Sequence, residues 1–288
     1  MQHIYVNFKR FDIPPTLGGV NRLGSSQEWA RILVASTLPY LKQYDRGEVA
    51  FTQFYPEAHI IGALQEKGDS PELAIGCQGV YRGDTSRGGN FGSFTTNRPA
   101  NAMVALGCED TIIGHCEERN DKNEILALGG NTTRAKVNEL LNKEILCAQK
   151  AGMKVLYCIG EKESELDDWK AVLSEQLTIG LEGCDLGTIT IAYEPVWSIG
   201  PGKKPADKAY ITKVARFIKE TIGNVGVVYG GGLKQENAAM LASIEEIDGG
   251  LIALTRFSGE IGFYPDEYLE IIQIYMQAKK GKEYQSEN

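Results

Sequence analysis

The sequence predicts an α/β fold, a closed (β/α)8 barrel, on three observations. Eight short apolar runs alternate with eight amphipathic stretches along the 288 residues. No linker-like stretch or compositional break divides the chain, so we expect a single domain over residues 1–288. The competing α/β architecture, an open doubly wound sheet, lacks support because no G-x-G-x-x-G follows the first apolar run. Eight strand-helix units in one domain of this length fit the closed barrel.

The apolar runs are short, as buried parallel strands are. In chain order, the expected strands cover residues 3–8, 49–55, 73–78, 111–115, 154–159, 188–193, 226–229 and 250–253. The amphipathic stretches predict helices over residues 26–42, 56–67, 98–106, 133–151, 163–179, 206–222, 235–243 and 265–279. Ser25 or Ser26 near the start of the first helix and Pro265 at the start of the last are typical helix-start signals. The polar residues from about 279 onward predict a frayed tail.

Charge and cysteine usage exclude several classes of protein. Thirty-eight acidic and thirty basic side chains give a formal charge of −8, which argues against binding to nucleic acid or an anionic membrane. The six cysteines lie far apart without a C-x-x-C pair, which favours buried, reduced thiols over a zinc ribbon or disulfides. The N-terminus lacks an apolar stretch of signal-peptide length, and no run is long enough to span a bilayer. We therefore expect a cytoplasmic protein whose partner is a small molecule or another protein.

Polar residues that could take part in catalysis follow several of the predicted strands. Asn7 and Lys9 follow the first strand, His115 and Glu117 the fourth, and Glu194 the sixth. In a (β/α)8 barrel these strand ends meet at one mouth, where the active site lies. A carboxylate, an imidazole and an ammonium are what proton transfer beside a carbonyl requires: a base, an electrophile and a cation.

Several segments carry a resemblance to a known family. Residues 192–203, Ala-Tyr-Glu-Pro-Val-Trp-Ser-Ile-Gly-Pro-Gly-Lys, closely resemble the base-and-lid motif of the triosephosphate isomerase family. Residues 7–9, 113–119, 157–161 and 229–231 resemble further motifs of that family, in the family's order over nearly the whole chain. The resemblance implies the TIM barrel and a cofactor-independent isomerase that interconverts dihydroxyacetone phosphate and glyceraldehyde 3-phosphate through an enediolate.

The resemblance also implies a role for each catalytic residue. Glu194 would be the base that moves a proton between two carbons, and His115, beside Glu117, would be the neutral electrophile. Lys9 would supply positive charge near the phosphate or the developing oxyanion, and Asn7 would hold Lys9 in position. Residues 195–203 would form a mobile lid that keeps water away from the intermediate.

The phosphate-binding end matches the family less well. Gly200 in the lid and Gly231 and Gly232 after the seventh strand are expected to turn backbone N–H groups toward the phosphate. Gly232 stands where the family carries a serine that latches the closed lid. The family's glycine pair after the eighth strand is replaced by Ala253 and Leu254. The residues that follow are Thr255 and Arg256, so guanidinium binding of the phosphate is an alternative to binding by amides.

Two loops are longer than the family pattern. Residues 10–25 form a Gly- and Pro-containing insertion at the mouth, which either reshapes the pocket for another sugar phosphate or covers an edge. Residues 81–97 form a long, glycine-rich loop. In the family this loop reaches into a neighbouring subunit, so the resemblance implies a homodimer.

Three functions remain open at this stage. The favoured one is an isomerase of triose phosphates. The second is an isomerase of a four-carbon ketose phosphate, of the erythrulose phosphate type, with the same base and electrophile. The third is a catalytically silent barrel that serves as a binding or scaffold protein. His3, His59 and His115 do not form a ligand-spaced cluster, so we expect no metal site.

Overall fold

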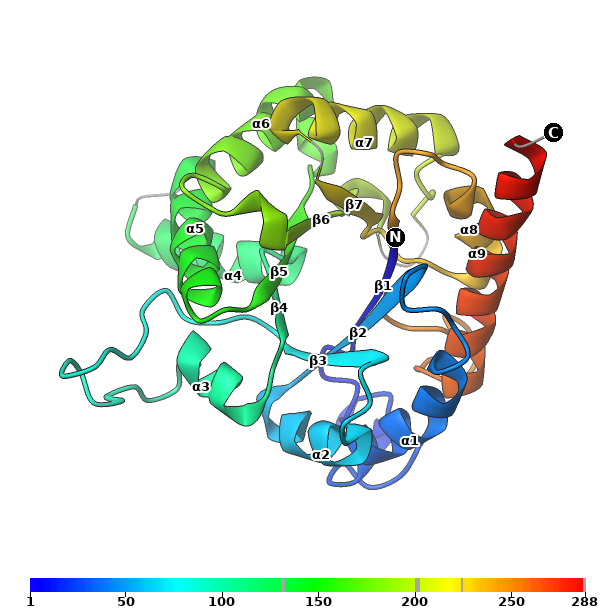
Figure 1. The fold of residues 1–288 in the computed structure, drawn as a ribbon. Helices are drawn as coiled ribbons and strands as arrows, with labels where there is room; N and C mark the ends of the chain where they lie inside the picture. The colour runs from blue at the N-terminus through cyan, green and yellow to red at the C-terminus, as the bar shows by residue number, and fades with distance from the viewer. Residues whose placement is uncertain (131–132, 200–202, 224, 287–288) are drawn as a thin grey trace.

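The structure, a computed structural model, describes residues 1–130, 133–199, 203–223 and 225–286, with side chains through residue 281. Eight parallel strands pair in sequence order, and the eighth pairs with the first to close the barrel. Viewed along the barrel, the helices surround the strands (Figure 1). The predicted (β/α)8 barrel is therefore confirmed.

The strands agree with the predicted runs to within two residues at every end. They are β1 (Gln2–Asn7), β2 (Val49–Tyr55), β3 (Leu73–Cys77), β4 (Asp110–Ile113), β5 (Lys154–Ile159), β6 (Ile189–Tyr193), β7 (Gly226–Tyr229) and β8 (Gly249–Ile252). The agreement follows from the apolar character of the runs, since a strand inside a (β/α)8 barrel is covered on both faces.

The helices differ from the prediction in three places. They are α1 (Trp29–Leu41), α2 (Glu57–Lys67), α3 (Ala100–Leu106), α4 (Cys116–Leu128), α5 (Arg134–Lys150), α6 (Trp169–Gly180), α7 (Lys208–Ile222), α8 (Gln235–Ala242) and α9 (Pro265–Ser286). The sequence did not predict α4, because none of its residues is buried and it therefore lacks apolar periodicity. The predicted helix over 163–179 is a 3-10 helix (Glu163–Asp168) followed by α6. The backbone stays helical to Ser286, where we expected a frayed tail from 279.

Two apolar layers hold the barrel together. The interior is filled by Tyr5, Phe54, Ile112, Leu156, Cys158, Ala192, Val228 and Leu251. Strand β3 contributes Gly76 beside this cluster, and a Cβ at Gly76 would lie 2.5 Å from Cδ1 of Phe54. The Phe54 ring therefore takes the space that a side chain on β3 would need.

The second layer lies between strands and helices. Ile4 and Val6 flank the inward-facing Tyr5 on β1 and belong to this outer layer, as alternation along a strand requires. On α7 the buried residues are Ile211, Val214, Ala215 and Ile218, spaced so that they share one face. In the described part of the chain, no helix is both long enough and apolar enough to cross a bilayer. This packing brings all eight C-terminal strand ends to one mouth.

Candidate active site

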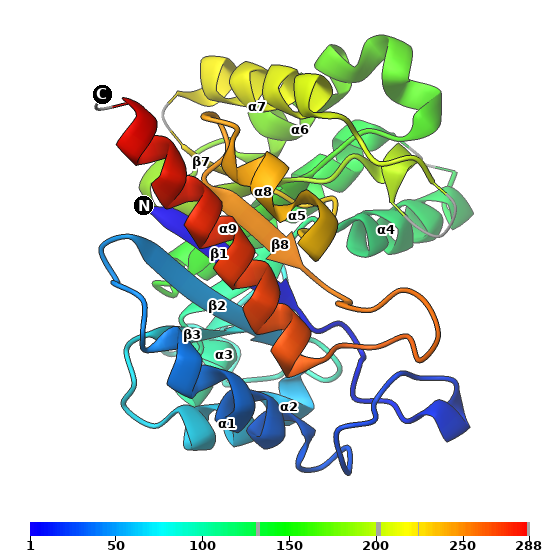
Figure 2. The same cartoon turned by 90° about the vertical axis from the view of Figure 1, so that its right-hand side faces the viewer.

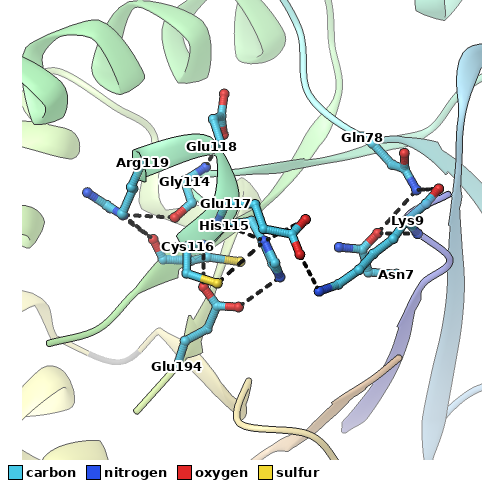
Figure 3. A network of polar contacts seen from close by, with 11 residues as sticks. Asn7, Lys9, Gln78, Gly114, His115, Cys116, Glu117, Glu118, Arg119 and Glu194 are labelled. Carbon is cyan, nitrogen blue, oxygen red and sulfur yellow. Dashed lines mark hydrogen bonds and ion pairs between the residues drawn. The ribbon is translucent and has the colours of Figure 1, made fainter. Parts of the chain in front are cut away.

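The structure brings the five predicted catalytic residues together at the mouth (Figure 3). Asn7 ends β1, His115 and Glu117 lie at the start of α4, and Glu194 follows β6. A cavity of about 150 Å3 is lined by Asn7, Lys9, Gln78, Ile112, His115, Glu117 and Glu118. The strand ends therefore form the shared polar site that their sequence positions predicted.

Local backbone contacts fix the tautomer of His115. This residue is the N-cap of α4, and the backbone N–H of Glu117 donates to its Nδ1 at 3.3 Å. Nδ1 can accept this hydrogen bond only while it carries no proton. The proton of the neutral ring is therefore on Nε2, which lies 3.1 Å from Oε1 of Glu194. The imidazole presents an N–H donor to the base.

Glu194 has the environment of a base. Its side chain is 2% exposed, and the backbone N–H of Cys116 donates to Oε2 at 3.0 Å. Burial raises the pKa of Glu194 above its ordinary value, although His115 and the Cys116 N–H oppose the shift. A carboxylate with a raised pKa binds a proton more strongly than an exposed one, which suits general base catalysis near neutral pH.

Lys9 is held in an unusual backbone conformation. Its φ is 43°, in the left-handed region that residues other than glycine seldom adopt. Oδ1 of Asn7 accepts from the Lys9 backbone N–H at 3.0 Å, a contact that suits the predicted positioning role of Asn7. The Lys9 ammonium pairs with Glu117 at 2.6 Å. Although partial burial opposes it, Lys9 lowers the pKa of Glu117, so this carboxylate stays ionised beside the ammonium.

Gln78 also supports Lys9, and sequence reasoning missed it. Its Nε2 donates to the backbone carbonyl of Lys9 at 3.0 Å and to Oδ1 of Asn7 at 3.2 Å. Gln78 directly follows β3, so a polar residue at the end of an apolar run was the signal that could have identified it.

Arg119 fixes the turn that carries His115, and it was also missed. Its guanidinium donates to the carbonyls of Gly114 at 2.8 Å and Cys158 at 2.9 Å, to the Tyr157 hydroxyl at 2.9 Å, and to Oδ1 of Asn138 at 2.8 Å. These bonds join the β4–α4 turn to β5 and α5. Because the partners come from distant segments, no local pattern marks Arg119 as a positioning residue.

Behind this turn, the partly buried Glu118 and Lys122 and the buried Glu144 form a charge cluster. Lys122 lies 2.8 Å from Glu118 and 3.0 Å from Glu144, and Glu118 also accepts from the Gly114 N–H. Burial and the neighbouring Glu118 raise the pKa of Glu144 to about 9. Glu144 therefore retains a proton at neutral pH, and the second carboxylate in the cluster stays neutral.

The start of the predicted lid is anchored beneath the mouth. The indole N–H of Trp197 donates to Oε1 of Glu161 at 2.7 Å, and the Tyr193 and Tyr210 hydroxyls donate to the same oxygen. Glu161 is fully buried, and burial raises its pKa. Residues 200–202, which include the predicted phosphate ligand Gly200, lie outside the described residues.

The residues predicted at the phosphate end differ in their contacts. Gly231 and Gly232 lie between β7 and α8, and a Cβ at Gly231 would lie 3.0 Å from Pro195 at the start of the lid. After β8, Arg256 and Thr255 both contact Glu267. Nε of Arg256 donates to Oε1 of Glu267 at 2.8 Å, and the Thr255 hydroxyl donates to Oε2. The Arg256 guanidinium is thus paired with a carboxylate. Phosphate binding by Thr255 and Arg256 stays a prediction.

A clasp of exposed Arg10 with buried Asp12 and His59 anchors the inserted 10–25 loop to α2. Asp12 accepts two hydrogen bonds from Arg10, at 2.9 and 2.7 Å, and its Oδ2 lies 3.0 Å from Nε2 of His59. Burial raises the pKa of Asp12, but the bonds to Arg10 and His59 outweigh it and lower the value to about 2. Asp12 is therefore ionised over the whole physiological range.

The 10–25 loop also contacts the 253–264 loop after β8. Arg22 donates to the Ile261 carbonyl at 2.8 Å and lies 3.6 Å from Glu260. Just before the 10–25 loop, the Phe8 ring packs edge to face on that of Phe263, with centroids 4.8 Å apart. Figure 2 shows the two loops near each other at the lower right, beyond the start of α9. Two segments that depart from the family pattern are thus joined to each other.

His115, Cys116 and Glu194 offer three potential metal-ligand atoms within 4.8 Å of one another. The spacing of the histidines did not predict this grouping, because Glu194 comes from a distant strand. Burial and Glu194 raise the pKa of the Cys116 thiol to about 12, so a metal would have to displace its proton. Since His115 and Glu194 already bond to each other, the contacts suit proton transfer, and the absence of a metal requirement stays a prediction.

Comparison with known proteins gives a consistent result. A family model described as triosephosphate isomerase matches residues 26–274. The triosephosphate isomerase of Chlorobium phaeovibrioides is 39% identical over 225 residues, 74% of this chain and 81% of the relative. That of Geobacter metallireducens is 30% identical over 251 residues, 83% and 92% of the two chains. The crystal structure of triosephosphate isomerase from Bartonella henselae shares the fold, with a TM-score of 0.69, 23% identity, and coverage of 96% of this chain and 99% of that one.

Proposed function

The chain belongs to the triosephosphate isomerase family, and from that premise we propose how its barrel mouth interconverts dihydroxyacetone phosphate and glyceraldehyde 3-phosphate. The observation that carries the proposal is the contact between Nε2–H of His115 and the buried carboxylate of Glu194. A donor and a base that face each other can act on neighbouring atoms of one small substrate. No cofactor is needed, because the reaction moves only protons.

The reaction begins with Glu194. Its carboxylate takes a proton from the carbon beside the carbonyl, and the electron pair left behind forms the carbon–carbon double bond of the enediolate. Negative charge then develops on the carbonyl oxygen, where Nε2–H of His115 donates a hydrogen bond and Lys9 supplies positive charge. Glu194 returns the proton to the adjacent carbon, and the proton bound to oxygen moves between the two oxygens through His115.

The roles of the supporting residues follow from their contacts. Asn7 and Gln78 hold the Lys9 backbone, and Glu117 pairs with the Lys9 ammonium. Gly200, Gly231 and Gly232 remain the proposed amide ligands of the phosphate. Chelation with EDTA should leave turnover unchanged, because every step uses protein groups.

A second candidate, isomerisation of a four-carbon ketose phosphate, is favoured by the contact between the 10–25 and 253–264 loops, since both segments depart from the family pattern. The deciding experiment follows deuterium uptake from D2O by NMR, with dihydroxyacetone phosphate and erythrulose phosphates in parallel. Exchange and turnover with the triose phosphate support the first candidate, and preference for a tetrulose phosphate supports the second. The absence of both deuterium exchange and turnover with every substrate supports a scaffold role.

We further propose a cytoplasmic homodimer. The segment between β3 and α3 projects away from the barrel (Figure 1), and Phe91 within it is 88% exposed. An exposed aromatic side chain on a projecting loop is typical of an interface. The cysteines are free thiols, as expected in a reducing compartment. Light scattering on wild type and on Phe91→Asp tests the assembly, since the introduced charge should yield monomers.

A further inference from the structure

The turn between β7 and α8 holds Lys234 in a fixed position at the mouth. Leu233 is fully buried, and its N–H donates to the Leu251 carbonyl of β8 at 3.0 Å. Asn237 accepts from the Lys234 N–H at 2.8 Å and donates to the Gly232 carbonyl at 2.9 Å. The backbone is therefore tied down on both sides of Lys234.

The side chain of Lys234 runs beside Gly232 toward an aromatic ring. A Cβ at Gly232 would lie 3.4 Å from Cε of Lys234, and the φ of Gly232, 96°, already favours glycine. The Lys234 Nζ lies 3.8 Å from the centroid of the Phe257 ring. The partner that the structure gives this ammonium is thus a ring face, not a carboxylate. A cation over a ring keeps its charge, and its remaining N–H groups can donate to an anion.

Other cations on this side of the mouth are already engaged. Arg256 forms a two-point ion pair with Glu267, and its guanidinium also lies over the Tyr264 ring. Arg22 donates to the Ile261 carbonyl and lies near Glu260. Lys234 differs from both because its described partner carries no negative charge. Among the described cations at this rim, Lys234 is therefore the candidate to meet a bound anion without first leaving a carboxylate.

We propose that Lys234 binds the phosphate of the substrate, and that Phe257 positions its ammonium. (β/α)8 barrels often bind phosphate at the loops after strands 7 and 8, beside the N-terminus of a short helix, and α8 occupies that place here. The glycines expected after β8 are absent, since Ala253 and Leu254 stand there. The Lys234 ammonium, at the neighbouring turn, replaces part of the phosphate binding that backbone N–H groups of those glycines would supply. The inference rests on the proposed function, because it assumes a phosphorylated substrate.

The test compares Lys234→Met with Lys213→Met. Lys213 is a matched control, because its ammonium also lies over aromatic rings, those of Trp169 and Tyr210, on α7. Each protein is titrated with inorganic phosphate by calorimetry. KM is measured with dihydroxyacetone phosphate, and kcat/KM with glyceraldehyde, which has no phosphate.

We expect Lys234→Met to weaken phosphate binding and raise KM by about 10- to 100-fold, the range for a hydrogen bond to a charged group. Its kcat/KM for glyceraldehyde should stay within about twofold of wild type, as should all values for Lys213→Met. Phe257→Leu should weaken phosphate binding by about threefold, through loss of the ring contact.

Two results separate the inference from the proposed function. If wild type binds phosphate and Lys234→Met binds it equally well, Lys234 is not a phosphate ligand, whatever the turnover. A loss of glyceraldehyde turnover equal to the loss with the phosphorylated substrate also overturns the inference, because it shows a general structural defect. If wild type isomerises no triose phosphate, the proposed function fails, and the calorimetric comparison still decides the role of Lys234.

Discussion

Nε2 of His115 lies 3.1 Å from Oε1 of Glu194, so the proposed electrophile and the proposed base bond directly to each other. For a substrate carbonyl to accept from Nε2, this contact must be exchanged for one with the substrate. The exchange is cheap for Glu194, because Oε2 keeps its bond to the Cys116 N–H. Oε2 thus stays anchored while Oε1 can exchange His115 for the substrate. This arrangement suits a carboxylate that carries a proton between two neighbouring carbons.

Replacement of Glu194 tests the base directly. Glu194→Gln keeps the shape and the acceptor oxygen of the side chain but cannot take up a proton. We expect kcat to fall by about 10^3-fold, within the range for a general base. Steady-state turnover measures the effect, with Glu139→Gln on the exposed face of α5 as the control. A fall of less than tenfold would remove Glu194 from the role of base.

The pH profile provides an independent test of the same group. Burial raises the pKa of Glu194 above 4.5, and the base acts in its ionised form. We therefore expect kcat/KM to fall tenfold per pH unit as the pH drops below this raised pKa. Initial rates between pH 4.5 and 9 give the profile. Constant kcat/KM down to pH 4.5 would contradict both the shift and the assignment.

Gln78 should matter for catalysis through Lys9. Gln78→Leu removes the donors to the Lys9 carbonyl and to Asn7, which leaves the left-handed Lys9 backbone with less support. We expect kcat to fall by about tenfold, the effect of a small displacement of the ammonium. Gln149→Leu is the matched control, because Gln149 also donates to a carbonyl, that of Asp185, before β6 at the other end of the barrel. Equal kcat values for the two variants would assign Gln78 a structural role alone.

The Asp12 clasp should make the free energy of unfolding depend on pH in the acid range. The folded pKa of Asp12 is about 2 and its ordinary value is 3.8, so its stabilisation is complete above about pH 4 and is lost as the pH falls through 2. Asp12→Asn should lower the unfolding free energy at pH 7 by about 1–3 kcal/mol. Urea unfolding at pH 7, 4 and 3 should show the difference from wild type shrinking below pH 4. A difference that is constant with pH would mean that Asp12 is not preferentially ionised in the folded protein.

Glu144 should show the opposite behaviour. Its folded pKa of about 9 lies above the ordinary 4.5, so the folded chain holds a proton that the unfolded chain releases between these values, and stability falls as the pH rises across that window. Glu144→Gln removes this loss and should raise the unfolding free energy at pH 8 by on the order of 1 kcal/mol. Glu118→Gln should lower it, because Glu118 accepts as a carboxylate from Gly114 and Lys122. Thermal unfolding of both variants at pH 5 and pH 8 tests the contrast. A variant Glu144→Gln less stable than wild type at pH 8 would show that Glu144 is ionised.

The sequence predicted what depends on local pattern. The strands are mostly apolar, so all eight were found, and the polar residues that follow them, together with the family resemblance, led to the prediction of Glu194 and His115 as catalytic residues. Helix α4 was missed because it buries no residue and therefore has no apolar stripe. Gln78 and Arg119 were missed because their partners lie on other strands and helices. The ion pair of Arg256 with Glu267 was not foreseen because nothing in the sequence indicated it, and phosphate binding by Arg256 stays a prediction.

Arg22 and Ile261, which join the two rim loops, lie 239 residues apart in the chain. A growing polypeptide therefore makes the first loop long before the second exists. During synthesis from the N-terminus, the 10–25 loop cannot form its contact with the 253–264 loop until the ribosome has translated β8 and the segment beyond it. The catalytic side chains up to Glu194 are made before that contact can form, so this part of the rim is among the last parts of the molecule to be completed.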